Sequence, residues 1–109
     1  MTAPLYEAKA DLFRILGHPM RVRVLELLVE QPMPVRDLLT HIQVEPSNLS
    51  QQLGVLRRSG LVSSSRQGTT VLYSVDNPFI SDLLLAGRKL LAQEWTDTKE
   101  LLEELGETP

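Results

Sequence analysis

Polar side chains gather on one face of a predicted helix in the middle of the chain. The helix spans residues 47–59, and its outer face and flanks carry hydroxyl, amide and guanidinium groups but no carboxylate: Ser47, Asn48, Ser50, Gln51, Arg57 and Arg58. Amide side chains pair well with adenine in the major groove of DNA, and guanidinium groups bind guanine or phosphate oxygens. We therefore expect the start of this helix to contact bases and its two arginines to contact the DNA backbone.

An ordinary solvated helix would carry similar side chains, so the segment that follows is needed for the argument. Two β-branched runs, 61–66 and 69–75, predict an antiparallel hairpin. Its tip offers one cation and several hydrogen-bond donors: Arg66, Gln67, Gly68 and Thr69. A plain turn would also explain this tip, but the helix and the hairpin together favour a DNA-binding surface with residues 61–75 as its wing.

The distribution of charge supports this interpretation although the net charge does not. The net charge is −3, which taken alone argues against a nucleic-acid partner. However, residues 46–75 contain no Asp or Glu, whereas Arg57, Arg58 and Arg66 give this segment three positive charges. Acidic residues instead concentrate in the tail, 90–109. An acid-free, arginine-bearing segment inside an acidic chain is typical of a phosphate-binding surface.

The rest of the chain predicts the elements that would position this surface. Apolar residues at three- and four-residue spacing indicate helices at 5–16, 19–30 and 35–42, separated by prolines. Four helices, a hairpin and a last helix at 79–104 make a mainly α fold in the order of a winged helix-turn-helix. At 109 residues, the chain 1–109 is expected to be a single domain.

The last predicted helix is apolar on two sides. One row follows near-heptad spacing and includes Ile80, Leu84, Gly87, Leu91 and Trp95, and a second row lies beside it. Only one row can pack on a domain of this size, so the other predicts self-association. Gly87 would allow two helices to approach closely, or it marks a kink. A two-fold dimer would place its recognition helices about 34–36 Å apart, so the DNA site should be an inverted repeat.

The chain lacks the residues that several classes of function need. The chain has no cysteine, only two isolated histidines, no paired nucleophile and base, and no glycine-rich phosphate loop. We therefore expect neither an enzyme nor a bound cofactor or metal. No stretch reaches the 18–20 apolar residues of a membrane span. A cytoplasmic protein without a membrane partner, associated with the nucleoid when it is bound to DNA, is expected.

The sequence resembles the ArsR/SmtB family of bacterial winged-helix repressors from about residue 8 to residue 91. Three stretches carry the resemblance: 16–25 (LGHPMRVRVL), 50–62 (SQQLGVLRRSGLV), and 66–68 (RQG) followed by Tyr73. The resemblance implies that Ser50 reads DNA and that Gln51 and Gln52 occupy the neighbouring DNA-binding positions. Where the family commonly has a lysine, this chain has Gly54. The resemblance also implies dimerisation through the first and last helices, which adds Leu5 and Leu12 to the interface.

Many members of that family sense metals, and this chain lacks the residues of their usual sites. Pro34 and Arg36 occupy the positions of the two thiolate ligands, and no histidine follows His41. The expected function is thus a DNA-binding transcriptional regulator, most simply a homodimeric repressor, with a small-molecule effector left open. The alternatives are a winged-helix protein-interaction module that does not bind DNA, and a metal-responsive repressor with a non-standard site.

Overall fold

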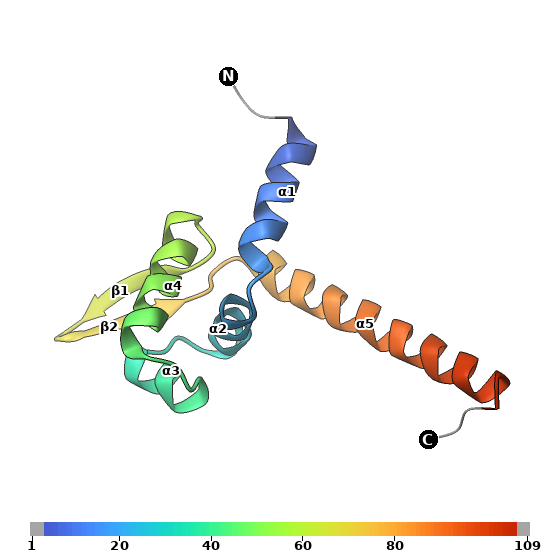
Figure 1. Ribbon diagram of the computed structural model, residues 1–109. Coiled ribbons are helices and arrows are strands. Elements are labelled where there is room, and N and C mark those ends of the chain that lie inside the picture. The colour runs from blue at the N-terminus through green and yellow to red at the C-terminus, as the bar shows by residue number, and fades with distance from the viewer. Residues whose placement is uncertain (1–3, 107–109) are drawn as a thin grey trace.

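The computed structural model describes residues 4–106 and has the element order that the sequence predicts (Figure 1). Its five helices and two strands are α1 (Leu5–Leu16), α2 (Pro19–Glu30), α3 (Val35–His41), α4 (Pro46–Arg58), β1 (Ser63–Gln67), β2 (Thr70–Ser74) and α5 (Pro78–Glu104). The expectation of a mainly α fold with one small hairpin is confirmed. The helix bounds agree with the predicted ones to within one residue.

The core lies where α2, α3 and α4 meet. Each helix contributes apolar residues spaced three or four positions apart, so they share one face. The fully buried side chains are Val24, Leu25, Leu28, Leu38, Leu49, Leu53 and Leu56. This packing fixes the orientation of α4 and leaves its opposite face to solvent.

Local capping sets the helix boundaries. Pro19 and Pro46 stand in the first turns of α2 and α4, where the missing backbone N–H costs nothing. The N-cap of α2 is His18, whose Nδ1 accepts a hydrogen bond from the Met20 N–H at 3.2 Å. Gly60, with φ of +78°, follows α4 and ends it.

The hairpin is shorter than the sequence suggests. Strands β1 and β2 pair in antiparallel register from Ser63 opposite Ser74 to Gln67 opposite Thr70. The predicted first strand begins two residues too early, because Val62 is buried in the helical core and its N–H bonds to the Leu56 carbonyl. At this same end of the hairpin, two backbone hydrogen bonds between Met33 and Tyr73, of 2.9 and 3.0 Å, join β2 to the body.

Helices α1 and α5 project from this body in different directions (Figure 1). The radius of gyration is 17.6 Å, whereas a compact chain of this length has about 13 Å. Helix α1 has no buried residue, and α5 buries only Ile80. No helix in the described part of the chain is both long and apolar enough to cross a membrane.

Candidate nucleic-acid interface

The outer face of α4 is as polar and open as expected. Ser47, Asn48, Ser50, Gln51, Arg57 and Arg58 are all exposed. The opposite face of the same helix is held in the core by Leu49, Leu53 and Leu56. A rigid helix with one buried edge presents its polar side chains in a fixed arrangement, as base reading requires.

The hairpin tip is also exposed. Arg66, Gln67, Gly68 and Thr69 lie at the turn, where the two-residue connection needs a positive φ at its first position. Gly68 has φ of +66° and satisfies this need. Figure 1 shows α4 and the hairpin together at the end of the molecule away from α5. The two predicted parts of the DNA surface therefore belong to one end of the fold.

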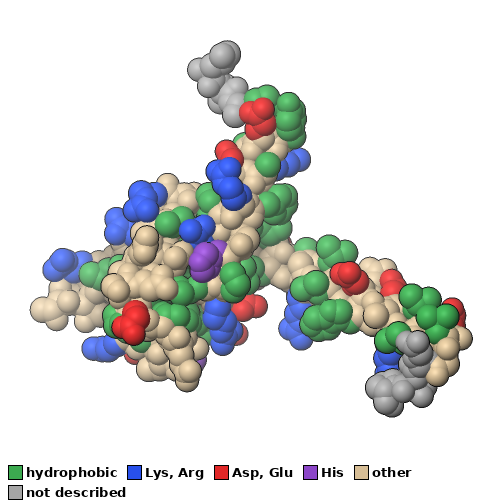
Figure 2. All heavy atoms as spheres, in the orientation of Figure 1, with side chains coloured by type: hydrophobic (Ala, Val, Ile, Leu, Met, Phe, Trp, Pro, Cys, Tyr) green, Lys and Arg blue, Asp and Glu red, His purple; other side chains and the backbone are tan. Residues whose placement is uncertain are grey.

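The positive charges of this end are not neutralised within the chain. Among residues 4–106, the ion pairs join Arg14 to Asp11, Arg23 to Glu26 and Arg36 to Asp37. None involves Arg57, Arg58 or Arg66. In Figure 2, several basic side chains lie at the hairpin end of the molecule, while the two projecting helices carry acidic, basic and hydrophobic side chains together. The charge that the sequence places in residues 46–75 is thus available for phosphate.

Gly54 and Arg58 form a small hollow on α4. A Cβ added to Gly54 would lie 3.1 Å from Nη1 of Arg58, so the guanidinium group folds back over the glycine. Together with Arg57 these residues line a hollow of about 220 Å³. The space that a longer side chain would fill at position 54 is taken by Arg58. The positive charge that a lysine at position 54 would provide is therefore supplied by Arg58, from the next turn of the helix.

Gln52 does not lie on the outer face, although the family resemblance implies that it binds DNA. Its side chain is buried, at 8% exposure. Its Oε1 accepts a hydrogen bond of 2.7 Å from Nε of Arg21 in α2, and its Nε2 donates to Oδ1 of Asn48 at 3.4 Å. Helical spacing already indicates that Gln52 is buried, since it lies three residues after Leu49 and four before Leu56 on the same face of the helix. Its partner Arg21 lies on another helix, 31 positions earlier in the chain, so no local sequence pattern indicates this contact.

The positions that correspond to the family's thiolate ligands have other roles here. Pro34 is the N-cap residue of α3, and Nε of Arg36 lies 3.8 Å from Oδ1 of Asp37. Within residues 4–106, no three His, Cys, Asp or Glu side chains come close enough to hold a metal ion.

The residues expected at a dimer interface fall into two groups. Leu5, Leu91 and Trp95 are exposed, and a side chain at Gly87 would meet open space. Ile80, in contrast, is 7% exposed and belongs to the core of its own chain. Leu84 is half-buried against that core, and Leu12 and Leu84 line a hollow of about 160 Å³ between α1 and α5. Ile80 is therefore a residue that anchors α5 to the body.

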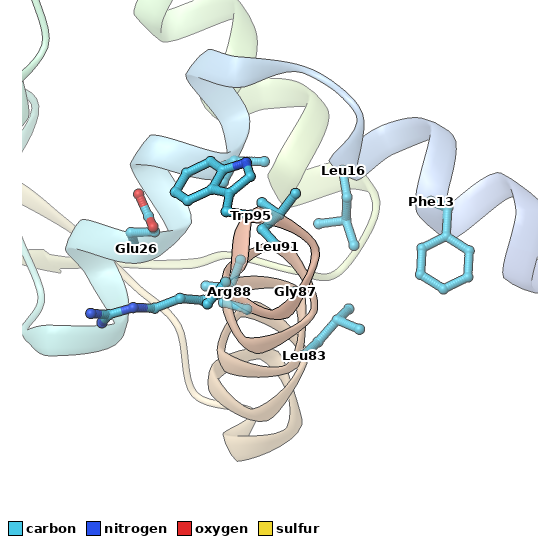
Figure 3. Close-up of a pocket in the computed structure, with 11 residues that line it drawn as sticks. Phe13, Leu16, Glu26, Leu83, Gly87, Arg88, Leu91 and Trp95 are labelled. Carbon is cyan, nitrogen blue, oxygen red and sulfur yellow. The ribbon is translucent and has the colours of Figure 1, made fainter. Parts of the chain in front are cut away.

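A larger apolar groove runs between the projecting helices. Its volume is about 630 Å³, and Figure 3 shows Phe13 and Leu16 of α1 on one side of it. Helix α5 supplies most of the opposite wall: Leu83, Leu84, Gly87, Arg88, Leu91, Ala92 and Trp95. The sequence predicts an unpartnered row on α5, but the groove depends on the angle between α1 and α5, which periodicity does not specify.

The chain is similar to known regulators over most of its length. A family model described as "Bacterial regulatory protein, arsR family" matches residues 18–64, which include α2, α3 and α4. An HTH-type transcriptional regulator of Mycobacterium tuberculosis, Rv0081, is 50% identical over 103 residues, covering 94% of this chain and 90% of the relative.

Solved structures agree with these sequence similarities. The crystal structure of Rv0081 matches with a TM-score of 0.82 at 49% identity, covering 89% of this chain and 98% of that one. The transcriptional repressor BigR from Xylella fastidiosa matches with a TM-score of 0.73 at 33% identity, covering 78% and 87% of the two chains.

Proposed function

Because the chain belongs to the ArsR family of bacterial DNA-binding transcriptional regulators, we propose that it is a repressor that binds an inverted-repeat operator as a homodimer. The observation that carries this proposal is the exposed, acid-free face of α4. Hydroxyl and amide groups occupy its first turns, and its last turn carries two guanidinium groups that form no ion pair with residues 4–106. In helix-turn-helix proteins the first turns of the recognition helix meet base edges.

The residues divide by role along the surface. Ser47, Asn48, Ser50 and Gln51 read bases, because they lie in the first two turns of α4. Arg57 and Arg58 bind phosphate, which positions the protein without specifying sequence. The wing residues Arg66, Gln67, Gly68 and Thr69 rest on the neighbouring backbone or minor groove. Gln52 supports the surface from inside.

The apolar groove supports the homodimer. Large side chains on α1 and α5 remain exposed in one chain, among them Leu5, Phe13, Leu90, Leu91 and Trp95. An exposed apolar surface of this extent usually marks an interface, and each Å² removed from water contributes about 25 cal/mol. A second copy has matching helices. Two-fold symmetry then yields two α4 helices, hence two equivalent half-sites.

The relatives favour repression of transcription over activation. BigR, which shares the fold at 33% identity, is called a transcriptional repressor. Blocking promoter access requires only that the dimer occupies its operator.

Selection from random-sequence duplexes tests this function. The full chain is incubated with the library, bound duplexes are sequenced, and binding is then measured on the enriched duplex and on a scrambled one. We expect enrichment of an inverted repeat, with half-sites about 10 base pairs apart from centre to centre. Gln51→Ala should alter the preferred base at one position of each half-site, whereas Gln43→Ala, outside α4, should not. Failure to enrich any sequence would favour a protein-interaction module instead.

A further inference from the structure

A chain of hydrogen bonds connects the end of α1 to the base-reading end of α4. Arg21 of α2 is at its centre. Its Nη1 donates to the Ile15 carbonyl in the last turn of α1 at 3.2 Å, and its Nε donates to Oε1 of Gln52 at 2.7 Å. Nε2 of Gln52 then donates to Oδ1 of Asn48 at 3.4 Å. Buried and exposed side chains are thus linked across three helices.

The chemistry of Arg21 fixes the direction of every bond in this chain. A guanidinium group has only donors and stays charged at all accessible pH values. The Gln52 atom that faces it must therefore be the carboxamide oxygen, which turns the NH₂ group of Gln52 toward Asn48. That NH₂ group has only hydrogens to offer, so the Asn48 atom that faces it must be oxygen as well.

As a result, the side of Asn48 that faces outward has a fixed hydrogen-bonding direction. With Oδ1 of Asn48 held toward Gln52, its NH₂ group is left on the exposed side of α4. Asparagine usually reads adenine with both carboxamide atoms, the oxygen accepting from N6 and the nitrogen donating to N7. Here only the donor side is free. In the major groove guanine and thymine present acceptors and no amino group, whereas cytosine presents only its amino group and adenine presents its amino group beside the N7 acceptor. A side chain that can only donate is therefore best matched by a keto base.

We propose that the Arg21–Gln52 pair is a specificity-determining device that makes Asn48 a hydrogen-bond donor, so that Asn48 selects a keto base in each half-site. Arg21 and Gln52 are positioning residues and do not touch DNA. The inference rests on the proposed function, because it assigns the base class read by one residue of that surface.

The direct test is Gln52→Glu, which keeps the size and the acceptor for Arg21. A carboxylate at this position still pairs with the guanidinium group, so its charge is compensated, but it has no hydrogen to donate. It attracts the NH₂ group of Asn48 inward and turns Oδ1 outward. The preferred base at the Asn48 position should change from guanine or thymine to adenine or cytosine, with the ratio of the two classes changing roughly tenfold.

Selection from random-sequence duplexes supplies the readout. Asn48→Ala identifies the base position that Asn48 reads, because this variant should lose the base preference of the parent at that position. Gln43→Glu, which adds the same charge in the exposed connection before α4, should keep the base class of the parent. Arg21→Met frees the carboxamide of Gln52 to rotate. This variant should therefore lose the preference for keto bases at the position that Asn48 reads, while the base preferences at the other positions stay unchanged.

The outcomes separate this inference from the proposed function. If the parent enriches no sequence, the proposed function is wrong and the inference is lost with it. If the parent enriches a motif but folded Gln52→Glu keeps the keto preference, the inference is wrong and the function stands. If circular dichroism shows that Gln52→Glu is unfolded, Arg21→Met decides: an unchanged keto preference overturns the inference, and a levelled one supports it.

Discussion

At the scale of single residues, Arg58 supplies a cation that pairs with no acidic side chain within residues 4–106. We predict that Arg58→Ala weakens binding to all duplexes alike. Each phosphate contact contributes about 0.9 to the slope of log K against log salt, so loss of one contact per protomer should flatten the slope by roughly 2 for the dimer. Fluorescence anisotropy at several salt concentrations measures it. Arg23→Ala, on α2, is the control, and an unchanged slope for Arg58→Ala would contradict the role.

Gly54 leads to a second residue-scale prediction, with opposite effects on stability and binding. Gly54→Ala removes a glycine from a helix interior and should raise the free energy of unfolding by about 0.5–1 kcal/mol. The added Cβ would stand 3.1 Å from Nη1 of Arg58, so the guanidinium group must move and DNA affinity should fall. Denaturant titration and anisotropy measure the two effects.

A double-mutant cycle separates this mechanism from a general change in the helix. In an Arg58→Ala background, Gly54→Ala should still stabilise the protein but should no longer weaken DNA binding. An equal loss of affinity in both backgrounds would show that Gly54 acts independently of Arg58.

At the scale of elements, the start of α2 depends on an unusual cap. His18 accepts the Met20 N–H through Nδ1, a task that Ser, Thr, Asp and Asn perform more often. We predict that His18→Ala lowers the free energy of unfolding by about 1 kcal/mol, whereas His18→Asn preserves most of it. Urea titrations at one protein concentration compare the variants. Equal stability of His18→Ala and the parent would show that the cap contributes nothing.

The elements also show what the sequence can and cannot predict. Helices α1 and α2 agree with their predicted bounds because Pro19 and regular apolar spacing both mark them. The predicted first strand begins two residues too early, since the apolar pair Leu61 and Val62 fits a strand pattern although Val62 packs in the helical core. Tertiary contacts decide such short segments.

At the candidate site, the sequence located the outer face of α4 but not its internal support. Exposed polar residues follow from helical geometry, because the positions of Leu49, Leu53 and Leu56 define the buried edge. Gln52 shares that edge, whereas the family resemblance implies a DNA contact for it. Its partner Arg21 lies 31 positions away in the chain. No local pattern reveals a pairing between two helices.

At the scale of the whole molecule, the proposed homodimer predicts a change around Trp95. Trp95 is the only tryptophan, and it is 70% exposed beside the apolar groove. We predict that its fluorescence maximum shifts to shorter wavelength as protein concentration rises, because dimerisation removes the indole from water. Leu91→Glu, which places a charge in the groove, should abolish the shift and halve the mass in sedimentation. A parent whose emission and mass are those of a monomer at all concentrations would refute the dimer.

The distribution of charge also belongs to this scale. The acidic residues of α5 lie far along the chain from the arginines of α4 and the hairpin, and Figure 2 shows acidic side chains on the projecting helices. The proposed DNA surface therefore occupies one end of a chain whose net charge is negative. This arrangement also disfavours nonspecific contacts of the other surfaces with nucleic acid.

Methylation protection on the enriched duplex tests the central claim most directly, because dimethyl sulfate modifies guanine N7 in the major groove. If two α4 helices of a symmetric dimer read DNA, the protein protects two patches on the same face of the duplex, with centres one helical turn or about 10 base pairs apart. Protection should be lost in the Leu91→Glu monomer at the same concentration. A single protected patch, or none on a duplex that the protein retains, would contradict the account.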